Sequence, residues 1–187
     1  MRFRSSLRLR DRPLRWKTIL KIPNARRQSE PPDIYSTCAG SSKTDDGFRL
    51  IWVRSSQKAT QDAQVREDRL RQAEIALAQL NRGLNRRHLK KQKAVREKYH
   101  AILRKYNVEP WLDVSLHTYS EVETRYAHPG RPRPDSPVRG VRTRKLKLSI
   151  QRDAQTLRRE AYTDGVFPLV TDLERVSKRE VLLMYKY

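Results

Sequence analysis

The strongest periodic pattern of hydrophobic positions lies between residues 60 and 107. Apolar side chains recur there at steps of three and four, which places them on one face of an α-helix. The first stripe consists of Leu70, Ala73, Leu77, Leu80 and Leu84, and the second of Val95, Tyr99, Ile102 and Tyr106. Asn81, Gly83 and Asn85 separate the stripes and are poor helix-interior residues. The pattern predicts two helices that fold back as an antiparallel hairpin, so that each stripe covers the other.

Alternation of apolar and polar positions predicts strands before the helices. The predicted strands cover residues 14–22, 34–38 and 48–53. In the first of them the apolar positions alternate with Arg15, Lys17 and Lys21, and only Ile19 breaks the period of two. Residues 40–47 carry the Ser, Asp and Gly composition of a turn.

A long β-hairpin is predicted after the helices, within residues 111–150. Its first strand carries Leu112, Val114, Leu116, Tyr119 and Val122. The change of spacing after Leu116 predicts a bend or a bulge. Residues 127–138 contain four prolines and one glycine, so they form the connection rather than strand or helix. The return strand places Arg144, Leu146, Leu148 and Ile150 on one face and Thr143, Lys145, Lys147 and Ser149 on the other.

Short elements follow in the last part of the chain. Asp153 is placed to cap a short helix. Thr163-Asp164-Gly165 predicts a turn, and residues 166–170 form an apolar run of the buried-strand type. The segment 177–187 begins with Ser and carries Glu three positions later, a capping box that opens a helix. These helices and hairpins together predict an α+β fold.

The chain carries a large positive charge. Its 187 residues include 42 lysines and arginines against 21 acids, a formal net charge of +21. Such a charge repels itself in the compact state and favours a polyanionic partner. Residues 1–13 form a basic N-terminal segment, and no run of about eighteen apolar residues is present to span a membrane.

Few residues offer catalytic or metal chemistry. Cys38 is the single cysteine, which excludes an internal disulfide, and no spacing of Cys and His is typical of a zinc site. The acids that could contribute to a divalent-metal site are Asp45, Asp46, Asp153, Asp164 and Asp172. Turn or capping positions explain all of them except Asp172, which stands without convergent partners in the sequence. We therefore expect no catalytic residue, no bound cofactor or metal and no small-molecule substrate in this chain.

Basic residues recur in four clusters, in which arginine is prominent. Its planar guanidinium suits phosphates and base edges. One cluster lies in the strand at residues 14–22, and the other three supply the candidate DNA-binding residues Arg86, Arg87, Lys90, Lys91, Arg131, Arg133, Arg142, Arg144, Lys145 and Lys147. A single cluster is equally compatible with an ordinary solvated face. Four clusters on so basic a chain favour contact with DNA or RNA, and no motif distinguishes the two polymers.

Several blocks of the sequence resemble the insertion-sequence transposases of the Asp-Asp-Glu (DDE) superfamily, in the group whose catalytic core carries a β-rich insertion. The blocks are GFRLIWVRSS at 47–56, RLRQAE at 69–74, GRPRPDS at 130–136, TDGVFPLVTD at 163–172 and EVLLMYK at 180–186. They follow one another in the order of the family, and the block at 163–172 is the most specific.

The resemblance implies a division into domains. Residues 14–162 would form the β-rich insertion domain, with a long antiparallel helical hairpin at 60–107, and residues 163–187 a partial edge of an RNase H-like core. The strands that flank residues 166–170 in that core and the first two catalytic acids would precede Met1, and the catalytic Glu would follow Tyr187. The strand at 166–170 is accordingly expected to lack neighbours and to be loosely attached.

The resemblance also implies a function. The chain would be a truncated part of a bacterial, cytoplasmic transposase, and it would bind DNA non-specifically through its basic faces. It would lack the carboxylates that hold Mg²⁺ in the intact family, whose members can be homodimers, and so would be inactive. Two alternatives remain: a basic RNA- or ribosome-associated protein, and a coiled-coil interaction module. Sustained coiled coils need three or four heptads, and only about two precede the break at Asn81.

Overall fold

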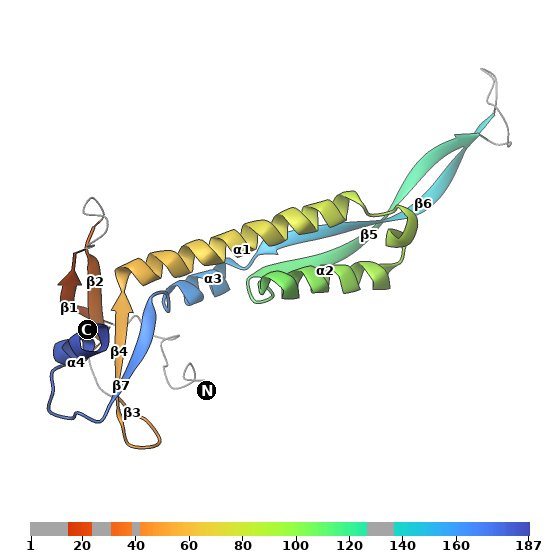
Figure 1. Ribbon diagram of the computed structural model, residues 1–187. Coiled ribbons are helices and arrows are strands. Elements are labelled where there is room, and N and C mark those ends of the chain that lie inside the picture. The colour runs from red at the N-terminus through yellow and green to blue at the C-terminus, as the bar shows by residue number, and fades with distance from the viewer. Residues whose placement is uncertain (1–14, 24–30, 39–41, 127–136) are drawn as a thin grey trace. The chain divides into compact units, whose positions relative to one another are not determined.

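The computed structural model describes residues 15–23, 31–38, 42–126 and 137–187 (Figure 1). The chain divides into two compact units, one formed by Met1–Glu67 with Gln155–Tyr187 and the other by Asp68–Ala154. We call the first the sheet unit and the second the ribbon unit. Helix α1 (Ser56–Arg82) contributes residues to both. The described residues combine α-helices with antiparallel strands, which confirms the α+β class.

The sheet unit consists of antiparallel strands with a helix on one face. Its strands are β1 (Trp16–Ile22), β2 (Asp33–Cys38), β3 (Ser42–Lys43), β4 (Arg49–Ser55) and β7 (Val166–Thr171). β4 is central, because β2 and the short β3 pair along one edge of it and β7 pairs along the other. The core beneath helix α4 (Lys178–Lys186) contains Tyr35, Ile51, Val53, Leu169, Val181 and Leu182.

Strand β1 confirms the strand predicted at residues 14–22 and explains the break in its alternation. Thr18 pairs with Ser36, but the next register partner is Leu20 with Tyr35, so Ile19 is an extra residue. A β-bulge of this kind inserts one residue into one strand of a pair. It allows both Ile19 and Leu20 to pack against the core of the sheet unit.

Strand β7 has a partner in this chain, so the expectation that residues 166–170 lack neighbours is wrong. β7 pairs with β4 from Arg49 opposite Thr171 to Arg54 opposite Val166. α4, which follows β7, starts with the predicted capping box, in which Ser177 and Glu180 exchange backbone and side-chain hydrogen bonds. The edge that pairs with β7 comes from a strand that the resemblance assigns to a different domain.

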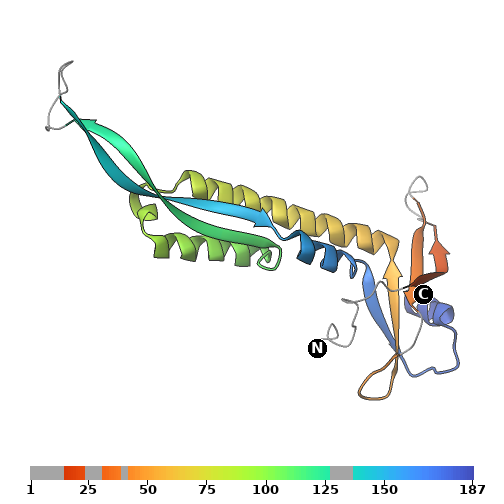
Figure 2. The ribbon, with the colours of Figure 1, turned by 180° about the vertical axis from the view of Figure 1, so that it is seen from behind.

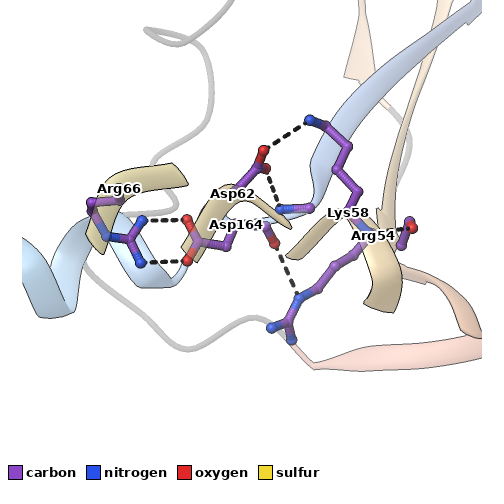
Figure 3. A network of polar contacts seen from close by, with 7 residues as sticks. Arg54, Lys58, Asp62, Arg66 and Asp164 are labelled. Carbon is purple, nitrogen blue, oxygen red and sulfur yellow. Dashed lines mark hydrogen bonds and ion pairs between the residues drawn. The ribbon is translucent and has the colours of Figure 1, made fainter. Parts of the chain in front are cut away.

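The turn at residues 163–165 is attached to the start of α1, within the sheet unit. The carboxylate of Asp164 accepts two hydrogen bonds from the Arg66 guanidinium, at 2.6 and 2.7 Å (Figure 3). The Gly165 N–H donates to Asp62 Oδ2 at 2.9 Å, and the Ser55 N–H donates to the Gly165 carbonyl at 3.0 Å. Polar contacts therefore join two segments that lie about a hundred residues apart in the sequence.

The ribbon unit combines the C-terminal part of α1 with the 3-10 turn η2 (Arg87–Lys90), helix α2 (Gln92–Tyr106) and the long strands β5 (Leu112–Tyr126) and β6 (Val138–Arg152). β5 and β6 form an antiparallel two-stranded ribbon, and Figures 1 and 2 show it running along both helices. Of the two predicted stripes, Leu70, Ala73, Leu77, Leu84, Val95 and Tyr99 are buried, whereas Leu80, Ile102 and Tyr106 are only half-buried. In α2 the buried position beside Ile102 is taken by Leu103, which lies outside the predicted stripe. These bounds confirm two helices within residues 60–107, and the first begins at Ser56. α3 (Ala154–Ala161) follows the ribbon.

β5 pairs with β6 without interruption, so the predicted bulge in the first strand of the hairpin is absent. The register is continuous from Leu112 opposite Arg152 to Tyr126 opposite Val138. Side chains of a regular strand alternate between faces, so Tyr119 lies on the face opposite to that of Leu116 and Val122. Tyr119 is 44% exposed. The apolar spacing is free to change at Tyr119 because, within the described residues, no core covers either face of the ribbon there.

The two compact units divide the chain differently from the boundary expected at residue 162. β1, β2 and β4 share the sheet unit with β7 and α4, whereas the ribbon and most of the helical residues form a unit of their own. The chain thus leaves the sheet unit along α1 and returns to it through α3.

Candidate nucleic-acid interface

Two asparagines hold the end of α1 on the open edge of β6. Asn85 Oδ1 accepts from the Leu146 N–H at 2.7 Å, and Asn85 Nδ2 donates to the Leu146 carbonyl at 3.0 Å. One turn earlier, Asn81 Oδ1 accepts from the Leu148 N–H at 2.9 Å. Asn85 has a φ of 65°, in the left-handed region that asparagine tolerates better than most residues. Its amide therefore pairs with β6 in the way a neighbouring strand would.

Gln92, the first residue of α2, makes a second attachment to the ribbon. Its Nε2 donates to Thr118 Oγ1 at 2.9 Å. Thr118 lies directly opposite Leu146 in the β5–β6 register. The connection from Asn85 to Gln92 is thus fastened at both ends to one residue pair of the ribbon. Two basic clusters about 55 residues apart in the sequence meet at this pair.

We define the junction surface as the exposed basic side chains on both sides of this attachment: Arg86, Lys90, Lys91, Arg142 and Arg144. Arg144 and Arg142 are the next residues of β6 on the face that carries Leu146. From Ile75 to Arg96 the sequence holds seven basic residues and no acid. Within the described residues no hydrogen bond or ion pair engages the five side chains. They can therefore meet the phosphates of a polyanion without first breaking a contact within the protein.

The other predicted candidates lie elsewhere. Lys145 lies on the opposite face of β6, where its Nζ forms ion pairs of 2.7 Å with Glu121 and 2.8 Å with Glu123. Contact with the Lys145 ammonium, and then with Arg125, lowers the pKa of the Glu123 carboxyl to about 2. Lys147 is exposed on that same face. Arg131 and Arg133 lie outside the described residues, as does the side chain of Arg87, and the cluster of β1 belongs to the sheet unit.

A groove along α2 contains basic residues that the cluster analysis missed. Its volume is about 710 Å³, and its lining consists of Gln92, Lys93, Arg96, Glu97, His100, Arg104 and Glu109. Arg96, His100 and Arg104 follow one another at steps of four, a helical spacing that could have identified them. Glu97 and Glu109 offset part of their charge, so the groove attracts a polyanion less strongly than the junction surface does.

Carboxylates in the described residues are not arranged as a metal site. Asp164 is fully engaged by Arg66, and the side chains of the pair are only 11% and 14% exposed. Asp45 and Asp46 lie in the exposed turn between β3 and β4. Across the described ranges, no group of three or more His, Cys, Asp or Glu side chains could hold a metal ion. These residues do not fit the two-metal centre that the resemblance implies for the intact family.

No family model, curated protein or solved structure matches this chain. The observations that bear on function are therefore the blocks of resemblance and the chemistry of the junction surface. In the part of the chain that the structure describes, no helix combines the length and the apolar character that a membrane crossing requires.

Proposed function

We propose that the chain is part of a DDE-superfamily transposase and that its role is to bind duplex DNA through backbone phosphates. The observation that carries this proposal is the junction surface, whose two basic clusters are joined by the hydrogen bonds of Asn85 and Gln92 to the pair Thr118–Leu146. Neutralising phosphates with lysine and arginine releases counterions, which supplies most of the affinity of non-specific DNA binding. A net charge of +21 adds long-range attraction to the same partner.

The arrangement of the resembling blocks supports the transposase part of the proposal. The blocks at 47–56 and 163–172 form β4 and β7, which pair with each other, so in this proposal β4 belongs to the core with β7 and not to the insertion. We propose that β7 and α4 belong to the edge of an RNase H-like core. In the same proposal, the ribbon unit is the β-rich insertion, with its two helices folded back as a hairpin.

In this proposal the chain does not cleave DNA by itself, because two divalent metals need several convergent carboxylates. The purified protein, incubated with supercoiled plasmid and Mg²⁺ or Mn²⁺, should leave the plasmid intact. Metal-dependent nicking that disappears in Asp164→Ala would overturn this part of the proposal. The test is informative because Asp164 is a buried acid within the most specific of the resembling blocks.

Binding itself is tested by fluorescence anisotropy with a labelled duplex of about 25 base pairs at several salt concentrations. If six or more phosphates are contacted, affinity should fall by about a thousandfold or more between 50 and 200 mM salt. Binding that does not respond to salt, or no binding at low salt, would contradict the proposal. Clearly tighter binding to an RNA duplex of the same sequence would favour a basic RNA-associated protein instead.

A further inference from the structure

The outer half of the β5–β6 ribbon has no protein partner on either face within the described residues. Beyond the pair Thr118–Leu146 the register continues to Tyr126–Val138, a length of about 27 Å at roughly 3.4 Å per residue. Figures 1 and 2 both show this part extending past the ends of the helices of its unit. Most of its side chains are exposed. Two strands without a covered face gain little stability from hydrophobic burial, and their exposed side chains are accessible to a partner.

The two faces of the outer ribbon differ in charge. One face carries the acids Glu121 and Glu123, which form ion pairs with Arg125 and Lys145, and it also carries Arg139. The other face, which we call the open face, is made of Ser120, Val122, Thr124, Tyr126, Val138, Gly140, Arg142 and Arg144. It contains two arginines and no acid. A polyanion therefore approaches the open face with less repulsion than the opposite one.

Resting on the proposed function, we infer that the open face of the ribbon enters the major groove of B-form DNA. A two-stranded ribbon fits the major groove, which is about 12 Å wide, and not the minor groove, which is about 6 Å wide. The major groove of A-form RNA is too deep and narrow to be contacted in this way. The fit therefore selects duplex DNA as the partner.

The side chains of the open face match the chemistry of that groove. Arginine binds guanine O6 and N7 in a bidentate manner, and Arg142 and Arg144 are the two arginines available for this contact. Val122, Tyr126 and Val138 are 67%, 52% and 58% exposed and can contact thymine methyl groups. Gly140 keeps the face shallow, because a Cβ there would lie 3.0 Å from Val122 Cγ1. In this arrangement Arg86, Lys90 and Lys91 hold the phosphates beside the groove.

The test compares Arg142→Gln/Arg144→Gln with the matched control Arg139→Gln/Lys147→Gln. Both pairs lie on exposed positions of β6 and remove two positive charges, but Arg139 and Lys147 lie on the face opposite to the open face. The measurement is dimethyl sulfate protection of guanine N7 in a bound duplex, with affinity from anisotropy. Wild type and control should protect N7. Arg142→Gln/Arg144→Gln should lose that protection and bind at least about tenfold more weakly, because two bidentate guanine contacts are lost.

The outcomes distinguish the groove assignment from the proposed function, which is DNA binding through phosphates. Binding of the wild type without N7 protection, or equal reductions of affinity in both double variants, would overturn the groove assignment and leave phosphate binding intact. An A-form RNA duplex bound as tightly as DNA would also overturn it. Absence of any binding at low salt would overturn the proposed function, and the groove assignment with it. Unchanged urea midpoints of both variants establish that they are folded.

Discussion

Gly165 lies where the turn after α3 touches the start of α1. Its φ of 73° is in the left-handed region, which disfavours side chains with a Cβ. A Cβ at this position would lie 2.7 Å from the backbone nitrogen of Ala59 and closer still to the Ser55 carbonyl oxygen. Both neighbours are backbone atoms and cannot rotate away. Because Gly165 has no Cβ, its backbone can come close enough to α1 to form hydrogen bonds with Asp62 and Ser55.

We predict that Gly165→Ala destabilises the protein far more than Gly47→Ala. Gly47 has a similar φ of 83°, but a Cβ there would have no atom within 4 Å. Gly47→Ala should therefore lower the free energy of unfolding only by the conformational cost, about 1–2 kcal/mol. Gly165→Ala adds steric overlap with backbone and should lower it by at least about 2 kcal/mol more. Urea denaturation of both variants measures the difference, and equal destabilisation would show that the turn is not held against α1.

Asp33 provides the first turn of α1 with an acid that the helix itself lacks. Its carboxylate accepts hydrogen bonds from Ser55 Oγ, Ser56 Oγ and the Gln57 N–H at 2.9 to 3.0 Å. Burial alone raises the pKa of Asp33, but the Gln57 N–H and the neighbouring hydroxyls, including that of Tyr35, outweigh it and lower the pKa below its ordinary value. A negative charge near a helix N-terminus is also favoured by the helix dipole.

A lowered pKa in the folded state gives a pH dependence of known sign. In the unfolded protein the Asp33 carboxylate takes up a proton near pH ~4. In the folded protein it takes up this proton only at a lower pH, because its pKa is lowered. The contribution of Asp33 to stability is therefore present above pH ~4 and is lost as the pH falls through the folded-state pKa. We predict that Asp33→Asn, which cannot titrate, loses less stability than the wild type between about pH 5 and 3. Parallel curves of unfolding free energy against pH would contradict this role of Asp33.

At the scale of elements, the main feature of the ribbon is the edge of β6 that does not pair with β5. An unpaired edge exposes N–H and C=O groups that invite pairing with another chain. Asn81 and Asn85 occupy those groups at Leu148 and Leu146. The end of α1 thereby protects the edge and at the same time positions Arg86 and η2 beside the ribbon.

We predict that Asn85→Gly destabilises the ribbon unit and that Asn107→Gly does not. Both residues have positive φ, 65° and 54°, so glycine is compatible with either backbone. The Asn85 variant lacks two hydrogen bonds to Leu146, which should lower the unfolding free energy by about 1–3 kcal/mol. At Asn107 the capping bonds are made by the backbone N–H and survive, so the change should stay within about 0.5 kcal/mol. Similar midpoints in urea for both variants would refute the edge pairing.

Sequence patterns predicted the elements better than their partners. The helical stripes, the capping box at Ser177 and the faces of β6 follow from local periodicity and were predictable. The start of α1 at Ser56 was missed although Ser55 is a local cap whose hydroxyl accepts from the Lys58 N–H. The second cap, in which the Asp33 carboxylate accepts from the Gln57 N–H 24 residues away, was not predictable. The partner of β7 was not predictable either, since pairing with β4 is a contact between distant segments. In the candidate site, the basic clusters were visible in the sequence. Their attachment to one residue pair of the ribbon depends on hydrogen bonds of Asn85 and Gln92. The sequence showed these two residues only as part of a break in the helical pattern.

At the scale of the whole molecule, the charge of +21 is spread over both units, and its arrangement decides its use. In the sheet unit, Arg66, Arg49 and Lys43 are engaged by Asp164, backbone carbonyls and Glu174. At the junction surface of the ribbon unit, the described residues supply no such partners. Overall charge attracts a polyanion, and the junction surface is where we place the contact.

The most direct test of the central claim is the salt dependence of DNA binding by two charge-matched triple variants. Arg86→Gln/Lys90→Gln/Lys91→Gln removes three charges from the junction surface, and Arg15→Gln/Lys17→Gln/Lys21→Gln removes three exposed charges from the sheet unit. If the junction side chains bind phosphates, the slope of log K against log salt should decrease in the first variant by about 0.9 for each phosphate that is no longer neutralised, up to about 2.7. The second variant should keep the wild-type slope. Equal slopes in the two variants would contradict the assignment of DNA binding to the junction surface.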